Sequence, residues 1–188
     1  GIGIPLPDMS YKIVKIGTFE KADNDEDGEI CISGPTVMKR YLDDPEETKK
    51  VLKRHSDGKI WLHTGDVGCM NKEGLVFFKS RLKRIIISSG YNIYPQYVEK
   101  VIMSHPSVST CTVVGIPHPY KKQVPKAYII LRENFDDTEE LRNDIKEYCK
   151  KSIVKYSIPA EYEYVKELPK TLVGKVAFTK LGGCNGKK

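Results

Sequence analysis

The stretch Ser80-Arg81-Leu82-Lys83-Arg84-Ile85-Ile86-Ile87 divides the sequence into two parts with different patterns. Before it, segments such as Tyr11–Lys15 and Glu29–Ser33 alternate apolar and polar residues with period two, which is typical of half-buried β-strands. After it, short apolar runs alternate with segments of helical periodicity. We therefore expect an α+β chain with its domain junction near Ser80–Lys83. Residues 1–81 should be rich in strands, and residues 82–188 should form a small α/β domain in which helices flank a short sheet.

The strand-rich part also contains the start signal of a short helix. Asp44 is a suitable N-cap, Pro45 can occupy the first helical position, and Glu47 falls at the capping-box position. The other elements expected here are strands at Ile60–His63 and Leu75–Lys79 and a turn at Asn71–Gly74.

The second part combines apolar strands with two helices. The segment Thr138–Lys151 is amphipathic, because its apolar residues recur with the spacing of one helix face. These residues are Leu141, Ile145, Tyr148 and Cys149. An earlier helix is expected to begin at Tyr94-Pro95 and to end near Ser104. The strands expected are Ile85–Ile87, Val108–Val114, Ala127–Leu131 and Glu161–Val165, with a turn at Ser88–Gly90.

The composition is that of an ordinary soluble globular protein. The 188 residues are 39% hydrophobic and 30% charged, and the formal net charge is +6. Lysine pairs such as Lys121-Lys122 and Lys150-Lys151 fit solvated faces better than a nucleic-acid footprint, which needs clustered basic residues with aromatic partners. We therefore expect no nucleic-acid partner. A polyanionic small molecule, such as a nucleotide or coenzyme A, suits the same charge.

The five cysteines, at positions 31, 69, 111, 149 and 184, are scattered and form no Cys-x-x-Cys or Cys/His ligand pattern. This usage predicts reduced thiols in a cytoplasmic protein and no metal site. We expect no membrane span, because no segment approaches the roughly 20 apolar residues that a membrane-spanning helix needs. The first residue is Gly1 rather than methionine, and we expect the chain to be a piece of a longer protein.

Three polar motifs follow one another along the chain. They are Thr64-Gly65-Asp66, then Arg81 ahead of a Ser-Gly turn, and finally Pro169-Lys170-Thr171-Leu172-Val173-Gly174-Lys175. Each motif taken singly is weak: Asp66 could bond its own backbone in a turn, and Arg81 and Lys175 could be ordinary surface residues. Their order, with a small domain's length of chain between the second and the third, resembles that of the nucleotide-binding end of carboxylate-activating enzymes.

These motifs resemble those of the adenylate-forming superfamily, which includes AMP-forming acyl-CoA synthetases, aryl-CoA ligases, peptide-synthetase adenylation domains and luciferases. Trp61–Asp66 resembles the family's aromatic-x-x-Thr-Gly-Asp motif, and Ser80–Lys83 resembles its Gly-Arg-x-Asp/Lys hinge. Pro169–Lys175 resembles its Pro-Arg/Lys-Thr-x-x-Gly-Lys motif. The resemblance covers essentially the whole chain but only the family's C-terminal third. It implies that residues 1–81 are the last, β-rich subdomain of the large N-terminal AMP-binding domain and residues 82–188 the mobile C-terminal domain.

The resemblance implies three contacts with ATP or AMP. A carboxylate can accept hydrogen bonds from two neighbouring ribose hydroxyls, so Asp66, held by a Thr64-Gly65 turn, would anchor the AMP ribose. Arg81 would be a second ribose or phosphate contact, because its planar guanidinium suits paired oxygens. Lys175 would be catalytic, since its ammonium would bridge the substrate carboxylate and the α-phosphate and offset the repulsion between them.

The resemblance also assigns a hinge and a coenzyme A contact. Lys83 falls on the hinge position, about which the C-terminal domain rotates between two half-reactions. Ser89, Gly90 and Tyr91 resemble the part of a loop that contacts coenzyme A in the second half-reaction.

The sequence departs from the family pattern at three positions. Ser80 stands where glycine is usual, and Arg84 stands where an acidic residue is common. The segment Gly115–Tyr120 resembles the family's Gly-x-Pro-Asp loop with His118 in place of the acidic residue, and we assign His118 no catalytic role.

The function implied for the parent protein is that of an ATP-dependent, AMP-forming acid–CoA ligase. It would convert a carboxylic acid and ATP to an acyl-adenylate and then form a thioester with coenzyme A. The stretches Tyr91–Pro95 and Val124–Ala127 resemble fatty-acid or aryl-CoA ligases more than peptide-synthetase domains. This sequence lacks the loop that cradles the triphosphate and the segment that binds adenine and Mg²⁺. We therefore expect the chain alone to be inactive, with the missing N-terminal domain of the same protein as its partner and as the source of the Mg²⁺ ligands.

Other functions remain open at this stage. The chain could be a standalone module that binds a nucleotide or a protein partner, or part of an adenylation domain that serves a carrier protein. A basic nucleic-acid-binding domain is a further alternative, which would show steeply salt-dependent binding.

Overall fold

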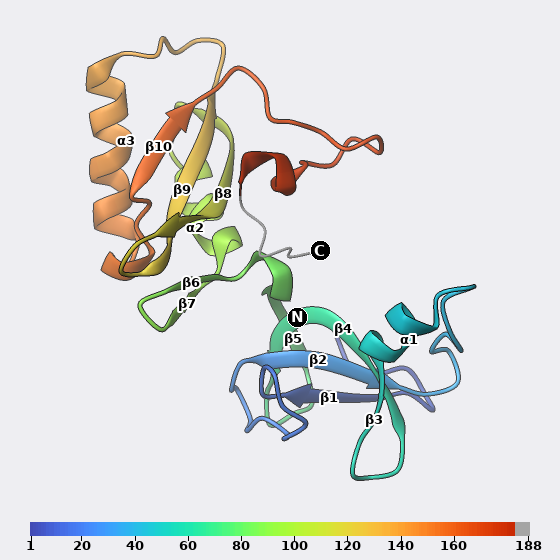
Figure 1. The fold of residues 1–188 in the computed structure, drawn as a ribbon. Coiled ribbons are helices and arrows are strands. Elements are labelled where there is room, and N and C mark those ends of the chain that lie inside the picture. The colour runs from blue at the N-terminus through green and yellow to red at the C-terminus, as the bar shows by residue number, and fades with distance from the viewer. Residues whose placement is uncertain (183–188) are drawn as a thin grey trace. The chain divides into compact units, whose positions relative to one another are not determined.

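The computed structural model describes residues 1–182 and divides the chain into two compact units, Gly1–Leu82 and Lys83–Lys188. The division lies next to the boundary between residues 81 and 82 that the sequence indicated. Each unit has a small sheet of its own (Figure 1). With three α-helices among residues 1–182, the α+β class predicted from the sequence is confirmed.

The sheet of the first unit is antiparallel and is built around its longest strand. Its elements are β1 (Ser10–Val14), β2 (Gly28–Ser33), α1 (Pro45–Val51), β3 (Leu52–Arg54), β4 (Ile60–Met70) and β5 (Val76–Arg81). The strand order is β1-β2-β4-β3, and β5 pairs with β4. Leu62 pairs with both Ile32 and Leu52, and Val67 pairs with both Glu29 and Ser80. Strand β4 is therefore hydrogen-bonded to β2 along one edge and to β3 and then β5 along the other (Figure 1).

Alternation along the strands builds the core of this unit. On β1 and β2, Ile13 and Ile30 pack in one apolar cluster, whereas Val14 and Cys31 pack with Trp61 in another. This is the result that period-two patterning predicts for a sheet with both faces partly covered. Helix α1 begins where predicted, since the Asp44 side chain accepts a hydrogen bond from the Glu47 N–H at 2.8 Å.

The sheet of the second unit is antiparallel except for one parallel pair. Its strands are β6 (Ile86–Ser88), β7 (Tyr91–Ile93), β8 (Val108–His118), β9 (Lys122–Leu131) and β10 (Glu161–Tyr164). Its α-helices are α2 (Pro95–Met103) and α3 (Glu139–Ser152), and 3₁₀ turns lie at Leu82–Arg84, Lys155–Ser157 and Phe178–Leu181. The order is β10-β9-β6-β7, with β8 also paired to β9 and the β10–β9 pair parallel.

Helices and an irregular segment cover the two faces of this second sheet. One face packs against α2 and α3, with α3 lying alongside β10 (Figure 1). The residues at the centre of this cluster are Val98, Ile102, Val113, Ala127, Ile129, Ile145 and Cys149. The opposite face is covered by the C-terminal segment through Val165, Leu168, Val176, Phe178 and Leu181. The α-helices thus flank one face of the sheet, and the other is covered by a segment that includes the 3₁₀ turn Phe178–Leu181.

Two strands of the second unit differ from those the sequence predicted. Strand β7 was not predicted, but the turn that precedes it was: Ser89 and Gly90 have φ values of +49° and +85°, the pattern of a type I′ hairpin. Strand β8 runs through Gly115–His118, where a loop was expected. Pro117 is compatible with this strand because β8 pairs with β9 along one edge alone, so the other edge needs no N–H donor there.

The packing of α3 generates a stability prediction. Ile145 is fully buried between α3 and the sheet, so Ile145→Ala removes buried methyl groups and leaves a cavity. We expect the free energy of unfolding to fall by about 2–5 kcal/mol, measured by urea denaturation followed by far-UV circular dichroism. Asn143→Ala, at an exposed position of the same helix, is the control and should change it by less than about 0.5 kcal/mol. Equal effects of the two variants would contradict the assigned packing.

Candidate functional site

The Thr64-Gly65-Asp66 motif forms a bulge inside β4 and not the turn that the sequence predicted. Glu29 pairs with Val67 and Cys31 pairs with His63, so the three motif residues lie opposite the single residue Ile30. Extra residues on one strand leave the regular ladder and bend the strand locally. A turn signal can thus mark a bulge when both flanking segments pair with the same neighbouring strand.

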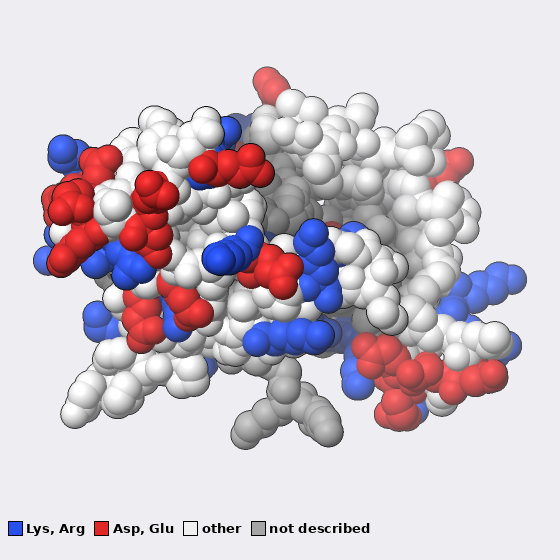
Figure 2. Space-filling model, turned by 90° about the horizontal axis from the view of Figure 1, so that it is seen from above, with Lys and Arg blue, Asp and Glu red and all other residues white. Residues whose placement is uncertain are grey.

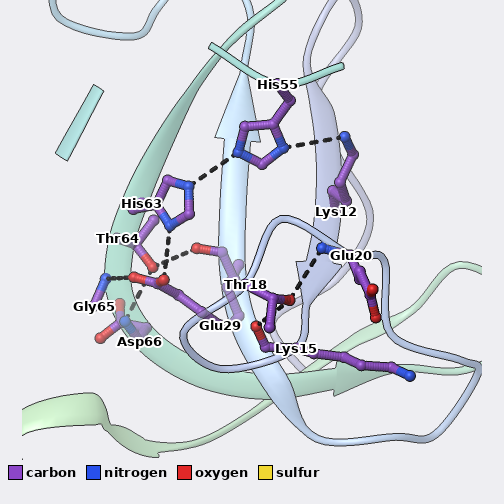
Figure 3. Close-up of polar contacts among 11 residues, drawn as sticks. Lys12, Lys15, Thr18, Glu20, Glu29, His55, His63, Thr64, Gly65 and Asp66 are labelled. Atoms are coloured by element: carbon purple, nitrogen blue, oxygen red, sulfur yellow. Dashed lines mark hydrogen bonds and ion pairs between the residues drawn. The ribbon is translucent and has the colours of Figure 1, made fainter. Parts of the chain in front are cut away.

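Side chains replace the missing ladder bonds at this bulge. The Thr64 hydroxyl donates to the Ile30 carbonyl at 2.7 Å and accepts from the Asp66 N–H at 3.1 Å. The Gly65 N–H donates to Glu29 Oε1 at 3.0 Å (Figure 3). Gly65 has a φ of +71°, a left-handed conformation that glycine adopts without strain. The motif is therefore held by three specific hydrogen bonds, two of them made by its own threonine.

Asp66 and Arg81 lie directly opposite each other on β4 and β5. In the sequence they belong to separate motifs. Arg81 Nε is 2.7 Å from Asp66 Oδ1, and the two side chains are 61% and 27% exposed. Oδ1 is shielded from solvent, yet no well-directed hydrogen bond reaches it from residues 1–182, so the contact with Arg81 is an ion pair of poor hydrogen-bond geometry. This oxygen therefore has unused capacity to accept a hydrogen bond, and a hydroxyl of a ligand could reach it once the groups that shield it move aside.

Lys175 lies on an exposed hairpin of the second unit. Lys170 and Val176 form a β-bridge, and the Thr171 N–H donates to the Lys175 carbonyl at 2.7 Å. Gly174 has a φ of +78°, which lets the chain turn just before the lysine. Lys175 is exposed, and within the described residues its ammonium has no ion-pair partner. The lysine is therefore available to a ligand.

The base of this hairpin is fixed to the sheet. The Ala177 N–H donates to the Pro169 carbonyl at 2.7 Å. Apolar residues on both sides of the hairpin pack against Val114 and Tyr128 of the sheet. Lys175 thus combines an anchored base with an exposed tip.

Lys83, the predicted hinge residue, is exposed in the 3₁₀ turn where the second unit begins. The next residue, Arg84, is tightly held: its Nη2 is 2.5 Å from Glu99 Oε1, which also accepts the Val113 N–H at 2.8 Å. The Arg84 guanidinium lies 4.0 Å from the centre of the Phe178 ring. Position 84 thus carries a basic residue where an acidic one is common in the family, and this basic residue has an acidic partner, Glu99, within the same unit.

The residues predicted to contact coenzyme A occupy the β6–β7 hairpin. The Ser89 N–H donates to the Lys121 carbonyl at 3.1 Å, and Gly90 has open space around it. Tyr91 is exposed and stacks on Tyr156 with ring centres 4.7 Å apart and planes 16° from parallel. The hairpin therefore presents backbone and an aromatic pair at the surface.

His118 makes a local contact, in which its Nδ1 accepts hydrogen bonds from the Tyr120 and Lys121 N–H groups at 3.3 and 3.2 Å.

A network of buried polar groups lies behind the bulge, and sequence reasoning missed it. His63 Nδ1 is 2.7 Å from Glu29 Oε2, His63 Nε2 is 3.0 Å from His55 Nε2, and Lys12 Nζ is 3.4 Å from His55 Nδ1 (Figure 3). Burial raises the pKa of Glu29, but the hydrogen bonds from His63 and from the Gly65 N–H help to outweigh this and leave the pKa below its usual value. No local signal points to this network, because Glu29 and His63 are separated by 34 residues.

Glu29 and His63 also lie near a cysteine. One potential ligand atom from each of Glu29, Cys31 and His63 lies within 4.8 Å of the others. Burial and the charge of Glu29 raise the pKa of the Cys31 thiol to about 12, which favours its protonated form. Both nitrogens of His63 and both oxygens of Glu29 are engaged in hydrogen bonds. The prediction of no metal site stays a prediction.

Basic and acidic side chains are interspersed on the visible face of Figure 2. Ion pairs between basic and acidic side chains also occur among the described residues: Lys126 lies 3.3 and 2.9 Å from Glu161 and Glu163. No helix among residues 1–182 is both long and apolar enough to cross a membrane.

Comparison with known proteins gives the same family for both units. A family model described as AMP-binding enzyme C-terminal domain matches residues 97–175. The long-chain-fatty-acid–CoA ligase of Bacillus subtilis is 41% identical over 181 residues, which are 96% of this chain and 31% of that protein. The 2-succinylbenzoate–CoA ligase of Bacillus licheniformis is 36% identical over 179 residues, 95% of this chain and 35% of that protein.

Solved structures show the same relationship. ATP-bound MatB from Rhodopseudomonas palustris superimposes with a TM-score of 0.83 at 27% identity, covering 96% of this chain and 34% of that one. The o-succinylbenzoate CoA synthetase of Bacillus subtilis, in complex with its acyl-adenylate intermediate, gives a TM-score of 0.81 at 32% identity and covers 98% and 36%. The chain spans about a third of the length of the relatives it matches. It belongs to the adenylate-forming enzymes and corresponds to their C-terminal portion.

Proposed function

We propose that this chain is the C-terminal part of an ATP-dependent acid–CoA ligase, and that it contributes contacts to the nucleotide and to coenzyme A. The ligase forms an acyl-adenylate and pyrophosphate from a carboxylic acid and ATP, and then transfers the acyl group to the thiol of coenzyme A with release of AMP. The observation that carries the proposal is the Asp66–Arg81 pair, which faces across β4 and β5 and leaves Asp66 Oδ1 without a directed donor. The names of the relatives, which are acid–CoA ligases, support it.

Asp66 would bind the ribose of the nucleotide. Its carboxylate can accept from the two neighbouring hydroxyls of a ribose, and Arg81 can release one oxygen to do so while remaining a contact for ribose or phosphate. Because the ribose is present in ATP, in the acyl-adenylate and in AMP, this contact serves both half-reactions.

Lys175 would act in the first half-reaction alone. When the substrate carboxylate approaches the α-phosphate, negative charge gathers at one point, and an ammonium placed there stabilises the transition state. The exposed tip and the anchored base of its hairpin suit a lysine that must enter an active site completed by another domain.

The second unit would rotate about Lys83 between the half-reactions. Residues 1–81 would belong to the large AMP-binding domain and residues 82–188 would be the mobile C-terminal domain. Rotation at Lys83 is compatible with the Arg84–Glu99 contact, because that contact ties the chain to the second unit from the next residue onward. In the second pose Ser89, Gly90 and Tyr91 would contact coenzyme A.

The remaining parts of the reaction lie outside this chain. The triphosphate loop, the Mg²⁺ ligands and the pocket for the carboxylic acid would come from the N-terminal portion that the relatives possess, and the chain alone would be inactive. The cytoplasmic location is part of the proposal, and the four free, buried cysteines among the described residues suit it.

A chimera tests the catalytic role of Lys175. This chain replaces the matching C-terminal portion of the Bacillus subtilis long-chain-fatty-acid–CoA ligase, and we expect the chimera to exchange pyrophosphate into ATP with a long-chain fatty acid. Lys175→Ala should lower this exchange by about a hundredfold or more but leave thioester formation from a preformed acyl-adenylate within a few-fold. Lys166→Ala, at an exposed position shortly before the same hairpin, is the matched control. Equal losses in both half-reactions would contradict the role given to Lys175.

The ribose contact predicts discrimination by Asp66. In the same chimera, Asp66→Ala should raise KM for ATP by roughly tenfold while leaving KM for the fatty acid unchanged. It should also reduce the preference for ATP over 2′-deoxy-ATP, since the deoxynucleotide lacks one of the two hydroxyls. An unchanged preference in a folded, active variant would show that Asp66 does not bind the ribose.

A further inference from the structure

The hydrogen bonds around Glu29 link the bulge to three other segments of the first unit. Glu29 lies on β2, with Oε1 accepting the Gly65 N–H of β4 at 3.0 Å and Oε2 lying 2.7 Å from His63 Nδ1. His63 in turn contacts His55, which follows β3, and His55 contacts Lys12 of β1 (Figure 3). One carboxylate therefore joins the backbone of the bulge to a chain of side chains that crosses the sheet.

The chemistry of the partners fixes the direction of every bond in this chain. Lys12 can only donate, so His55 Nδ1 accepts, and the proton of His55 lies on Nε2. His55 Nε2–H then donates to His63 Nε2, which leaves the proton of His63 on Nδ1 to be donated to Glu29. The Gly65 N–H is the last donor, and it meets the second oxygen of Glu29. When both imidazoles are neutral, every donor in this chain of hydrogen bonds therefore meets an acceptor.

The surroundings make this arrangement stiff. The side chains of His63 and Glu29 are 5% and 12% exposed, so water competes weakly for their hydrogen bonds. The ring of His55 packs against Trp61, and Phe19 makes T-shaped contacts with both imidazoles, with ring centres 5.0 and 6.0 Å apart. The Lys12 end is held by Asp57, whose carboxylate is 3.0 Å from the ammonium.

We propose that Glu29 and His63 are positioning residues for nucleotide binding, which orient Asp66 by holding the Gly65 N–H of the bulge. His55 assists them by selecting the His63 tautomer that donates to Glu29. This inference rests on the proposed function for the role of Asp66, but the hydrogen bonds themselves are independent of it. The reason for the role is geometric: Asp66 is the residue next to Gly65, and Gly65 itself pairs with neither β2 nor β5.

Three variants separate the hydrogen bonds from simple packing. Glu29→Gln keeps the size of the side chain but leaves its amide N–H₂ facing either Gly65 N–H or His63 Nδ1–H, both of which are donors. His63→Leu removes the donor to Glu29, whereas His63→Asn retains an N–H at the Nδ1 position and is the conservative variant. Glu73→Gln, the same chemical change at an exposed turn of the same unit, is the matched control.

The first measurement uses this chain alone and follows amide hydrogen exchange by NMR. We expect the Gly65 amide to exchange at least about tenfold faster in Glu29→Gln and His63→Leu than in the unaltered chain, with His63→Asn and Glu73→Gln close to it. Nitrogen shifts of the imidazoles should show His55 protonated on Nε2 and His63 on Nδ1. Unchanged Gly65 exchange in Glu29→Gln, or the opposite tautomers, would overturn the inference whatever the enzymatic result.

The second measurement uses the chimera and the ratio of kcat/KM for ATP to that for 2′-deoxy-ATP. Glu29→Gln and His63→Leu should raise KM for ATP by about tenfold and lower this ratio toward that of Asp66→Ala, whereas His63→Asn should preserve it. A merely structural role would lower the rates with both nucleotides equally and leave the ratio intact, which would overturn the inference.

Two further outcomes are distinguishable. A chimera that is folded but inactive with the unaltered chain would count against the proposed function, while the Gly65 exchange would still decide whether Glu29 and His63 hold the bulge. Tight one-to-one binding of Zn²⁺ to the chain, abolished by Cys31→Ser, would show that Glu29, Cys31 and His63 serve as metal ligands and would overturn the hydrogen-bonded assignment.

Discussion

The pairing of β4 with strands on both of its edges is the constraint on which the candidate site depends. The ladder to β5 places Asp66 opposite Arg81, and the ladder to β2 resumes on both sides of the Thr64–Asp66 bulge. Since the strand cannot shift in register without breaking both ladders, the bulge is confined to this one point. Its backbone then needs other partners, and Thr64 and Glu29 supply them.

In the second unit, alternation of side chains along the strands gives the sheet two apolar faces. The two helices cover only one of them. The C-terminal segment covers the other and thereby fixes the base of the hairpin that carries Lys175. A long, exposed lysine on an anchored hairpin is suited to reach a ligand without disturbing the core beneath it. The C-terminal segment thus contributes apolar side chains to the core, and the hairpin within it carries the lysine of the proposed chemistry.

Local sequence signals were sufficient wherever the partner lies nearby along the chain. The cap at Asp44, the helix that begins after Thr138 and its buried Ile145 follow from spacing alone. The same signals misled where pairing with a distant strand decided the outcome. Gly65 reads as a turn residue, but β2 and β5 keep its segment within a strand, and Gly115–His118 extends β8 because β9 offers it a partner. Propensity is a weak guide when tertiary pairing satisfies the backbone.

The sequence by itself determined the family and the α+β class, because motif order and hydrophobic period are properties of a linear chain. Only the tertiary structure decided that Asp66 and Arg81 form a pair, and that Glu29 lies between the Gly65 N–H and His63. The same holds for Arg84, whose acidic partner Glu99 lies 15 residues away on a helix. Hydrogen bonds and ion pairs depend on distances of about 3 Å, and folding alone brings such distant residues that close.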